Sequence, residues 1–499
     1  MRDIPVILFT GQHRYPERIP FHPPTRFPEL DFLGDETDPE NGVYAGVRNL
    51  LRAAGYDRAH YGGPQWSPLS DLCATGGTIV IKPNFVRHFS ENPRGSLESV
   101  VTHVSILRPL IDFALKATGP KGRVIVADAA QYDCEIETLL ERNHLPELLD
   151  FYRAQKGMNV EWRDLRVEFG RHDRGIQTEK RALAGDPEGY EAVNLGSSSE
   201  FSDLDPSRSQ LLRGADYDET VTIRHHADGK NEYLVSKTIL NADLVINVPK
   251  VKTHKKSGVT LSMKNLIGIN GDKNWLPHYR AGFVERGGDE FPRPDVYARF
   301  RHAGAEMARG LLKRGIGSGL LRRLRAVEDV SGLGRRARNG NWHGNDTIWR
   351  TCIDLNKIFY HGDRRGTLGT PTRRVLNVYD GIIAGEGDGP MGPDSRPIGL
   401  LASGEDGGCV DVVIAWMMGF DWRKIPVLRE ATREPRDGFR ITRFEGRPED
   451  LEVCWIDDQG ERRCAFADID LNLGFAPHPG WRGHIERPEE EEEASACAN

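Results

Sequence analysis

The sequence predicts an α/β protein in which a mostly parallel sheet, or more than one such sheet, is flanked by helices. Short apolar runs at 78–86, 122–128, 245–251 and 375–380 are typical of strands that are buried on both faces. Segments of helix length connect some of these runs, which is the βαβ pattern of a parallel sheet. We expect two lobes with a cleft between them, a β-rich insertion and a helical basic insertion.

The first elements follow from periodicity and from glycine and proline positions. Residues 6–10 predict a strand, and 41–54 predict a helix that ends at Gly55. A further helix is expected after Thr102, with apolar residues at three- and four-residue intervals through 106–114.

Polar residues stand at the ends of the two strands on either side of that helix. Pro83 cannot donate to a ladder, so the first strand must end there and Lys82 and Asn84 flank its end. The second strand, 122–128, ends in Asp128. Asp128 is either a site residue or the cap of the helix expected at 134–140.

The β-rich insertion is expected between residues 144 and 235. The segments 221–224 and 232–235 are joined through Ala227-Asp228-Gly229-Lys230, and Asp-Gly suits the turn of a β-hairpin. We therefore predict a hairpin here that leads into the next strand of the sheet.

The segment 244–278 is where we expect the functional site. A short apolar strand ends in a loop of lysines, hydroxyls and glycines, and an open α/β sheet binds its ligand at the carboxyl ends of its strands. Lysines favour an anionic ligand through charge-assisted hydrogen bonds. The candidates in this segment are Lys250, Lys252, Thr253, His254, Thr260, Lys264 and Asn265. For Lys255 and Lys256 we favour a solvated role, because charge runs usually face water.

Two later segments offer further candidates. Residues 299–338 hold 11 Lys or Arg against 3 acids; they form either a basic lid that attracts anionic partners or a peripheral amphipathic helical pair. The strand 375–380 ends in Asp380 and enters a glycine-rich loop with Glu386 and Asp388. This loop approaches a ligand closely or, as the alternative, holds a divalent metal.

The composition excludes several classes of protein. A net charge of −7 argues against a dedicated nucleic-acid binder, and no apolar run is long enough to span a bilayer. The seven cysteines are scattered without a C-x-x-C pair, so we expect reduced thiols, a cytoplasmic location and no iron–sulfur cluster.

The expected organisation is an α/β lobe at 1–235, a second at 236–485 with a helical insertion at about 295–360, and a disordered acidic tail at 486–499.

The segment KVKTHKKSGVTLSMKNLIGI, residues 250–269, resembles the hallmark segment of the domain of unknown function family 362. Blocks around 78–86, 345–354, 375–390 and Asp411 resemble the same family in the same order. Some relatives carry iron–sulfur modules, but the cysteine pattern here departs from theirs. The resemblance implies an architecture and a site, and no reaction.

The same segment is more distantly similar to the nickel-pincer lactate racemases. In that family a histidine precedes the cofactor-binding lysine by ten positions, and a second histidine follows; His254, Lys264 and His278 have this arrangement. Val126-Ala-Asp128 stands where the racemases have Gly-Thr-His, and Leu-Ser-Met-Lys where they have Gly-Gly-Arg-Lys. The similarity implies a shared architecture without the shared cofactor.

These observations predict an enzyme that binds a small carboxylate or phosphate metabolite and uses acid–base chemistry. We assign catalysis to His254, Lys264 and Asp128, since the ordinary pKa of histidine suits proton transfer at neutral pH. The predicted substrate-binding residues are Lys82, Asn84, Lys250, Lys252, Thr253, Thr260, Asn265, Asp380 and Glu386. The alternatives are a redox module that works with an iron–sulfur partner, and a non-catalytic anion-binding scaffold.

Overall fold

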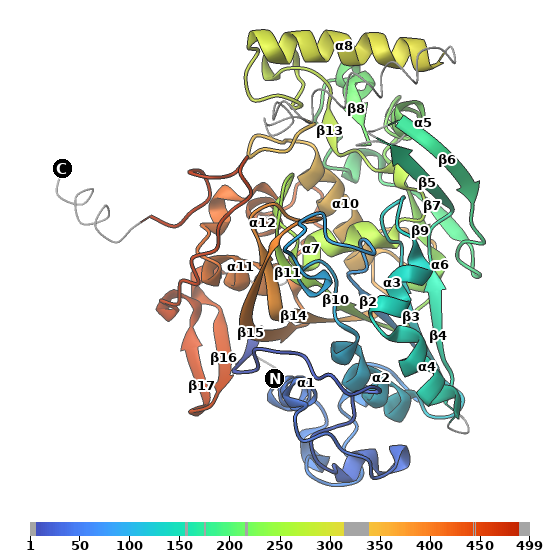
Figure 1. Cartoon of the computed structure of the whole chain (residues 1–499), viewed down its shortest axis with the longest axis vertical. Coiled ribbons are helices and arrows are strands. Elements are labelled where there is room, and N and C mark those ends of the chain that lie inside the picture. The colour runs from blue at the N-terminus through green and yellow to red at the C-terminus, as the bar shows by residue number, and fades with distance from the viewer. Residues whose placement is uncertain are drawn as a thin grey trace, which may run out of the picture.

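The computed structural model describes residues 6–154, 158–173, 176–214, 218–313, 339–442, 444 and 446–488. Within them, one 11-stranded sheet runs through the molecule, as Figure 1 shows. Nine of its strands lie in the order β17 (Gly460–Ala465), β16 (Glu452–Asp457), β1 (Val6–Thr10), β15 (Asp394–Gly404), β14 (Arg374–Glu386), β10 (Leu244–Val248), β2 (Thr78–Pro83), β3 (Arg123–Asp128) and β4 (Val160–Asp164). The other two, β11 (Lys250–His254) and β12 (Gly258–Val259), extend from β14.

The pairing confirms the predicted α/β fold with a mostly parallel sheet. Strands β14, β10, β2, β3 and β4 pair in parallel with one another in that order, and β11 continues the parallel pairing along β14 beyond Pro249. Antiparallel pairs occur at β15 and at the β16–β17 hairpin. The carboxyl ends of β2, β3 and β10 therefore meet at one edge of the sheet.

Alternation along the strands explains why helices cover both faces. Ile79 and Ile81 face a core formed with α1 (Gly42–Ala53), α2 (Val104–Thr118), α3 (Ile136–Arg142) and α4 (Leu145–Ala154). Val80, between them, faces the opposite core, which includes side chains of α6 (Lys237–Leu240) and α10 (Ile348–His361). A third cluster joins β1 and β14 to α11 (Gly407–Met417) and α12 (Pro426–Ala431).

The predicted hairpin at 221–235 is wrong, although its turn exists. Residues Glu219–His225 form helix α5, because the Asp218 side chain accepts a hydrogen bond from the Thr220 N–H and caps the first turn. Asp228 and Gly229 adopt the left-handed conformation that the Asp-Gly pair suggested. The turn leads into β9 (Glu232–Ser236), which pairs instead with β7 (Tyr190–Asn194).

Other small sheets make up the β-rich insertion. Strands β5 (Glu168–Asp173) and β6 (Ile176–Ala182) form a hairpin, and β8 (Leu212–Arg213) pairs with β13 (Tyr279–Arg280). Helix α8 (Val296–Lys313) lies at one end of the molecule (Figure 1) and starts the predicted helical insertion. The rest of the basic stretch, 314–338, lies outside the described residues, as does the acidic tail from 489 onward.

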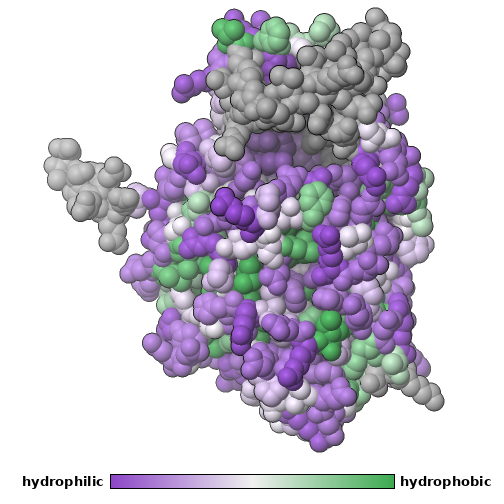
Figure 2. Space-filling model, viewed as in Figure 1, coloured by the Kyte–Doolittle hydropathy of each residue, from purple (hydrophilic) through white to green (hydrophobic). Residues whose placement is uncertain are grey.

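Two separate lobes are not confirmed. Strand β2, from the first predicted lobe, pairs directly with β10 from the second, and β1 pairs with β15 and β16. The division near residue 235 therefore does not coincide with a break in the sheet. The face of the molecule in Figure 2 is largely hydrophilic, with scattered hydrophobic patches.

Candidate functional site

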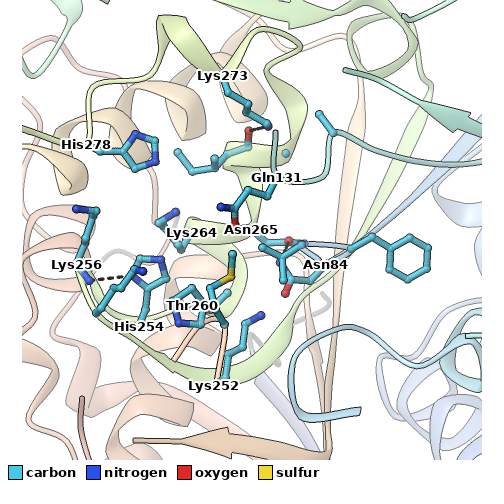
Figure 3. A pocket seen from close by; sticks show the side chains of 18 of the residues that line it. Asn84, Gln131, Lys252, His254, Lys256, Thr260, Lys264, Asn265, Lys273 and His278 are labelled. Carbon is cyan, nitrogen blue, oxygen red and sulfur yellow. Dashed lines mark hydrogen bonds between the residues drawn. The ribbon is translucent and has the colours of Figure 1, made fainter. Parts of the chain in front are cut away.

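A cavity of about 180 Å³ opens at the carboxyl ends of β2 and β3, and five lysines line it. We call it the lysine pocket, and Figure 3 shows His278, Lys256 and His254 on one side of it and Asn84 on the other. Its lining residues are Asn84, Phe85, Val86, Asp128, Ala129, Gln131, Lys252, His254, Lys255, Lys256, Thr260, Lys264, Asn265, Ile267, Gly268, Lys273, His278, Asn339, Asn341, Pro390 and Met391.

The wall of the pocket at β2 and β3 is held by a buried ion pair. Lys82 Nζ lies 2.8 Å from Asp128 Oδ1, and Asp128 Oδ2 accepts a hydrogen bond from the Phe85 N–H at 2.8 Å. Burial lowers the pKa of Lys82 and raises that of Asp128, while each charge partly offsets the shift of the other. Asp128 lines the pocket as predicted, whereas Lys82 lies behind it.

Gly268 allows the 266–269 turn to lie against this ion pair. A Cβ at this position would lie 2.1 Å from Asp128 Oδ1 and 2.6 Å from Lys82 Nζ. Its carbonyl also accepts the Ala129 N–H. Glycine is therefore required for the close approach of the 266–269 turn to the ion pair.

The predicted residues of β11 separate into two groups. Lys252 and His254 line the pocket. Thr253 lies between them in the strand, so its side chain takes the opposite face, where its hydroxyl donates to the Gly387 carbonyl at 3.0 Å. Lys250 is separated from Lys252 by a register shift against β14 and does not line the pocket.

Lys250 and Asp380 form a buried structural pair away from the pocket. Lys250 Nζ lies 3.0 Å from Asp380 Oδ2 and donates to the Tyr15 hydroxyl at 2.6 Å. Asp380 Oδ1 accepts from the same hydroxyl, and Oδ2 accepts from the His103 N–H. The expectation that Asp380 lies around the same cleft as Lys264 is therefore wrong, since its carboxylate is directed toward these partners.

Glu386 is also outside the lysine pocket. Its carboxylate lies 2.8 Å from Arg396 and accepts the Ala476 N–H at 2.9 Å, which anchors the end of β14. Asp388 lies 3.3 Å from His478. Among the described residues, no three or more His, Cys, Asp or Glu side chains gather so as to hold a metal ion, and the six cysteines they include are free.

The hydrogen bonds of His254 fix its tautomer. Nδ1 accepts from the backbone N–H groups of Lys256 at 3.0 Å and Ser257 at 3.2 Å, so the neutral ring carries its proton on Nε2. Burial lowers the pKa of His254 well below its ordinary value, and Lys264 lowers it further. His254 is thus a neutral hydrogen-bond donor toward the pocket, and the acid–base role predicted for it lacks an acceptor nitrogen.

His278, which sequence reasoning did not select for the site, has the opposite tautomer. Its Nδ1 donates to the Leu276 carbonyl at 2.7 Å, so Nε2 carries the lone pair. Burial lowers the pKa of His278 well below its ordinary value, with Lys264 as the next contributor. The two rings thus present different hydrogen-bonding atoms although both are neutral.

Helix α7 (Leu261–Asn265) positions Lys264 and Asn265. The Asp411 carboxylate accepts the N–H groups of Ser262 at 2.8 Å and Met263 at 3.0 Å. These bonds hold the start of the helix directly after Leu261, whose φ of 45° is unfavourable for a branched side chain. Burial raises the pKa of Asp411 to about 7.

Lys264 stands apart from the other pocket lysines. It is 8% exposed, and its ammonium has no hydrogen-bond or ion-pair partner among the described residues. Burial lowers its pKa; the Cys352 thiol opposes the shift and Lys82 adds to it. Figure 3 shows Lys264 between His278 and His254.

Three other lysines have backbone acceptors. Lys252 donates to the Val100 carbonyl, and Lys256 to the Asn339 carbonyl. Lys273 donates to the carbonyls of Ile267 at 3.1 Å and Asn270 at 3.2 Å, and burial lowers its pKa to about 7. Lys256 is 5% exposed, which corrects the solvated role that we favoured for it.

A chain of side-chain amides runs from Asn84, which lines the pocket, and two oxygens of the described lining have no partner. Asn84 donates to Asn265 Oδ1 at 2.8 Å, and Asn265 donates to Asn247 Oδ1 at 2.7 Å. The buried atoms Asn84 Oδ1 and Thr260 Oγ1 have no hydrogen-bond partner among the described residues. Buried polar atoms are rarely left so, which makes both candidates for ligand contacts.

The sequence missed Lys273, His278 and Gln131 as lining residues. Lys273 lies in a 3-10 turn and His278 in the loop after it, and the folding of 266–278 back against the end of β3, where the Ala129 N–H donates to the Gly268 carbonyl, brings both to the pocket. Gln131 lies in the loop directly after β3. Among the described residues, no helix combines the length and the apolar character needed to cross a membrane.

Comparison with known proteins gives three findings. Residues 189–416 match the model of the domain of unknown function DUF362. A thylakoid-associated protein of Synechocystis sp. is 24% identical over 208 residues, which are 42% of this chain and 42% of the relative. A protein from Thermotoga maritima of known crystal structure is 11% identical, with a TM-score of 0.32 over 73% of this chain and 55% of that chain.

The family match covers the segments that build most of the site. It includes β10, β11, α7 and the loop through His278, together with β14 and the Asp411 that holds α7. Over residues 189–416, this chain is therefore similar to the domain of unknown function family DUF362.

Proposed function

We propose that the lysine pocket binds a small organic anion, a carboxylate or a phosphate, and that the protein is an enzyme acting on it. The observation that carries the proposal is the unpartnered Lys264 side chain in a pocket that four other lysines also line. The one carboxylate in the lining, Asp128, is already paired with Lys82. A bound anion supplies the missing negative charge.

The lowered lysine pKa values support the same conclusion. Burial and repulsion by neighbouring lysines depress the pKa values of Lys252, Lys264 and Lys273. An anion would raise all three, because it favours the charged form of each amine. Keeping these buried lysines charged costs free energy of folding, and a bound anion offsets that cost.

Neutral donors and acceptors around the cations favour an enzyme over a scaffold. The His254 Nε2–H can stabilise negative charge that develops on a substrate oxygen, in the manner of an oxyanion hole. Amines with depressed pKa values can exchange protons near neutral pH. Asn84 Oδ1 and Thr260 Oγ1 would orient hydroxyl or amide groups of the substrate.

The basic helix α8 offers less support for a scaffold. Val296, Phe300 and Met307 are largely exposed, but none of them lines the lysine pocket. We keep a cytoplasmic location as part of the proposal, because the scattered cysteines fit a reducing compartment. Cell fractionation tests the location independently of the pocket.

Native mass spectrometry of the protein as purified tests the proposal. We expect a small anionic adduct on the wild-type protein that denaturation releases and that the Lys264→Met variant lacks. If the wild-type protein carries no adduct, inorganic phosphate and citrate are titrated by calorimetry. Failure of both anions to bind, or equal binding by the variant, would contradict the proposed site.

A further inference from the structure

Lys264 differs from three other lysines of the pocket, whose ammonium groups have backbone acceptors. Lys252, Lys256 and Lys273 each donate to backbone carbonyls, which hold their positions. Lys264 is 8% exposed and has no such acceptor among the described residues. A buried polar group without a partner is costly and is retained for a reason other than stability.

The surroundings of Lys264 favour the neutral amine. The Cys352 thiol opposes the lowering of its pKa, but the other charged groups that act on it or on which it acts are cations: Lys82 acts on Lys264, and Lys264 acts in turn on Lys252 and Lys273. The carboxylate among the described lining residues, Asp128, is paired with Lys82 at 2.8 Å. A desolvated lysine among cations is the usual setting of a nucleophilic amine.

We propose that Lys264 forms an imine with the carbonyl group of a small oxo acid whose carboxylate binds the other pocket lysines. The inference rests on the proposed anion site and names its substrate class. The Lys264 nitrogen bonds to the carbonyl carbon, the C–O bond breaks, and the oxygen leaves as water with the two amine hydrogens. The products are therefore one C=N bond and one water molecule, and no oxidant or reductant is needed.

The rest of the pocket fits this step. The neutral His254 donates from Nε2 and can hold the carbonyl oxygen as it gains negative charge. The cavity of about 180 Å³ suits a small substrate. Asp411 fixes the start of α7 through the Ser262 and Met263 N–H groups, so the stem of Lys264 begins from a defined position.

The test uses glyoxylate, the smallest oxo acid, with cyanoborohydride on the full-length protein at neutral pH. The hydride reduces the imine carbon and leaves a stable carboxymethyl group on the lysine, which peptide mass spectrometry locates. We expect Lys264 to be modified faster than the exposed Lys121, because burial lowers the pKa of Lys264 and so raises the fraction of its amine that is neutral. Lys264→Met should lose this modification, and Lys121→Met should retain it.

Glycolate has about the size and the charge of glyoxylate, but an alcohol replaces the aldehyde. It therefore separates the proposed anion site from the proposed imine. If glycolate stabilises the protein against unfolding and Lys264 is not modified by glyoxylate, the imine is refuted and the anion site stands. If glycolate does not bind and Lys264 is not modified, both are refuted. Modification of Lys264 at the rate of Lys121 also overturns the imine, because it shows an ordinary amine.

Discussion

Replacing Lys264 by methionine should stabilise the protein when no anion is added and should abolish its response to anions. The substitution removes the charged end of a side chain that is 8% exposed and keeps most of the volume of its stem. Because the ammonium has no partner among the described residues, no carboxylate or carbonyl among them loses a hydrogen bond.

The expected gain follows from the cost of an unpaired buried group. A buried donor without a partner costs about 1–3 kcal/mol, so we expect the free energy of unfolding to rise by about 1 kcal/mol. Lys250→Met is the matched control, since Lys250 is also a buried lysine, at 0% exposed, but pairs with Asp380 at 3.0 Å. Removing one partner of a buried ion pair costs about 3–5 kcal/mol, so the same substitution there should strongly destabilise the protein.

Urea unfolding of the wild-type protein and both variants, with and without phosphate, measures these differences. For the wild type, a ligand at 100 times its Kd adds about 2.7 kcal/mol to the free energy of unfolding, and Lys264→Met should show none of this gain. A loss of several kcal/mol in Lys264→Met without ligand would show that Lys264 has a structural partner. An unchanged response to phosphate would place the anion elsewhere.

Four further predictions address the rest of the pocket. Burial lowers the pKa of Lys273 to about 7, and a bound anion should raise it, so that anion binding takes up protons above pH 7. The affinity for the anion should therefore fall by up to about tenfold for each unit by which the pH rises above 7. Calorimetry in buffers of different ionisation enthalpy measures the proton uptake. His254→Asn keeps an acceptor near the position of Nδ1 and should weaken anion binding roughly tenfold with little loss of stability. His254→Gln should lower the free energy of unfolding by about 1–3 kcal/mol, because it leaves the N–H groups of Lys256 and Ser257 unpaired. Opposite results would refute the assigned tautomer. Asp411→Asn should destabilise the protein by about 1–3 kcal/mol, because the amide can accept from only one of the two N–H groups at the start of α7, and unchanged denaturation would contradict this tether. Gly268→Ala should cost about 1–3 kcal/mol by forcing apart Lys82 and Asp128, and a variant of wild-type stability would show that the turn can shift.

The sequence predicted the sheet well because its strands are short apolar runs with clear ends. Pro83 ends β2, and Asn84 and Asp128 lie at the pocket because the strands that carry them are parallel neighbours. The segment 250–269 likewise contains Lys252, His254, Thr260, Lys264 and Asn265, all of which line the cavity. Parallel pairing brings the ends of β2 and β3 to one edge, and β11 and α7, which follow the neighbouring β10 in the chain, carry the other residues to it.

The remaining residues depended on contacts that sequence patterns do not contain. Lys250 and Asp380 were predicted in the site because both follow apolar runs, but Tyr15, 235 residues from Lys250, joins them in a separate buried cluster. The tautomer of His254 depends on two backbone N–H groups in its own turn. The helix at 219–225 formed where a strand was expected, since Asp218 caps it.

The most direct test of the central claim is a crystal structure of the protein soaked in selenate, an oxyanion whose selenium gives an anomalous signal. We expect a selenium peak inside the lysine pocket, with selenate oxygens within hydrogen-bonding distance of Lys264 and of at least one of Lys252 and Lys273. Selenate bound only to exposed arginines and lysines, with the pocket free of any anion, would contradict it.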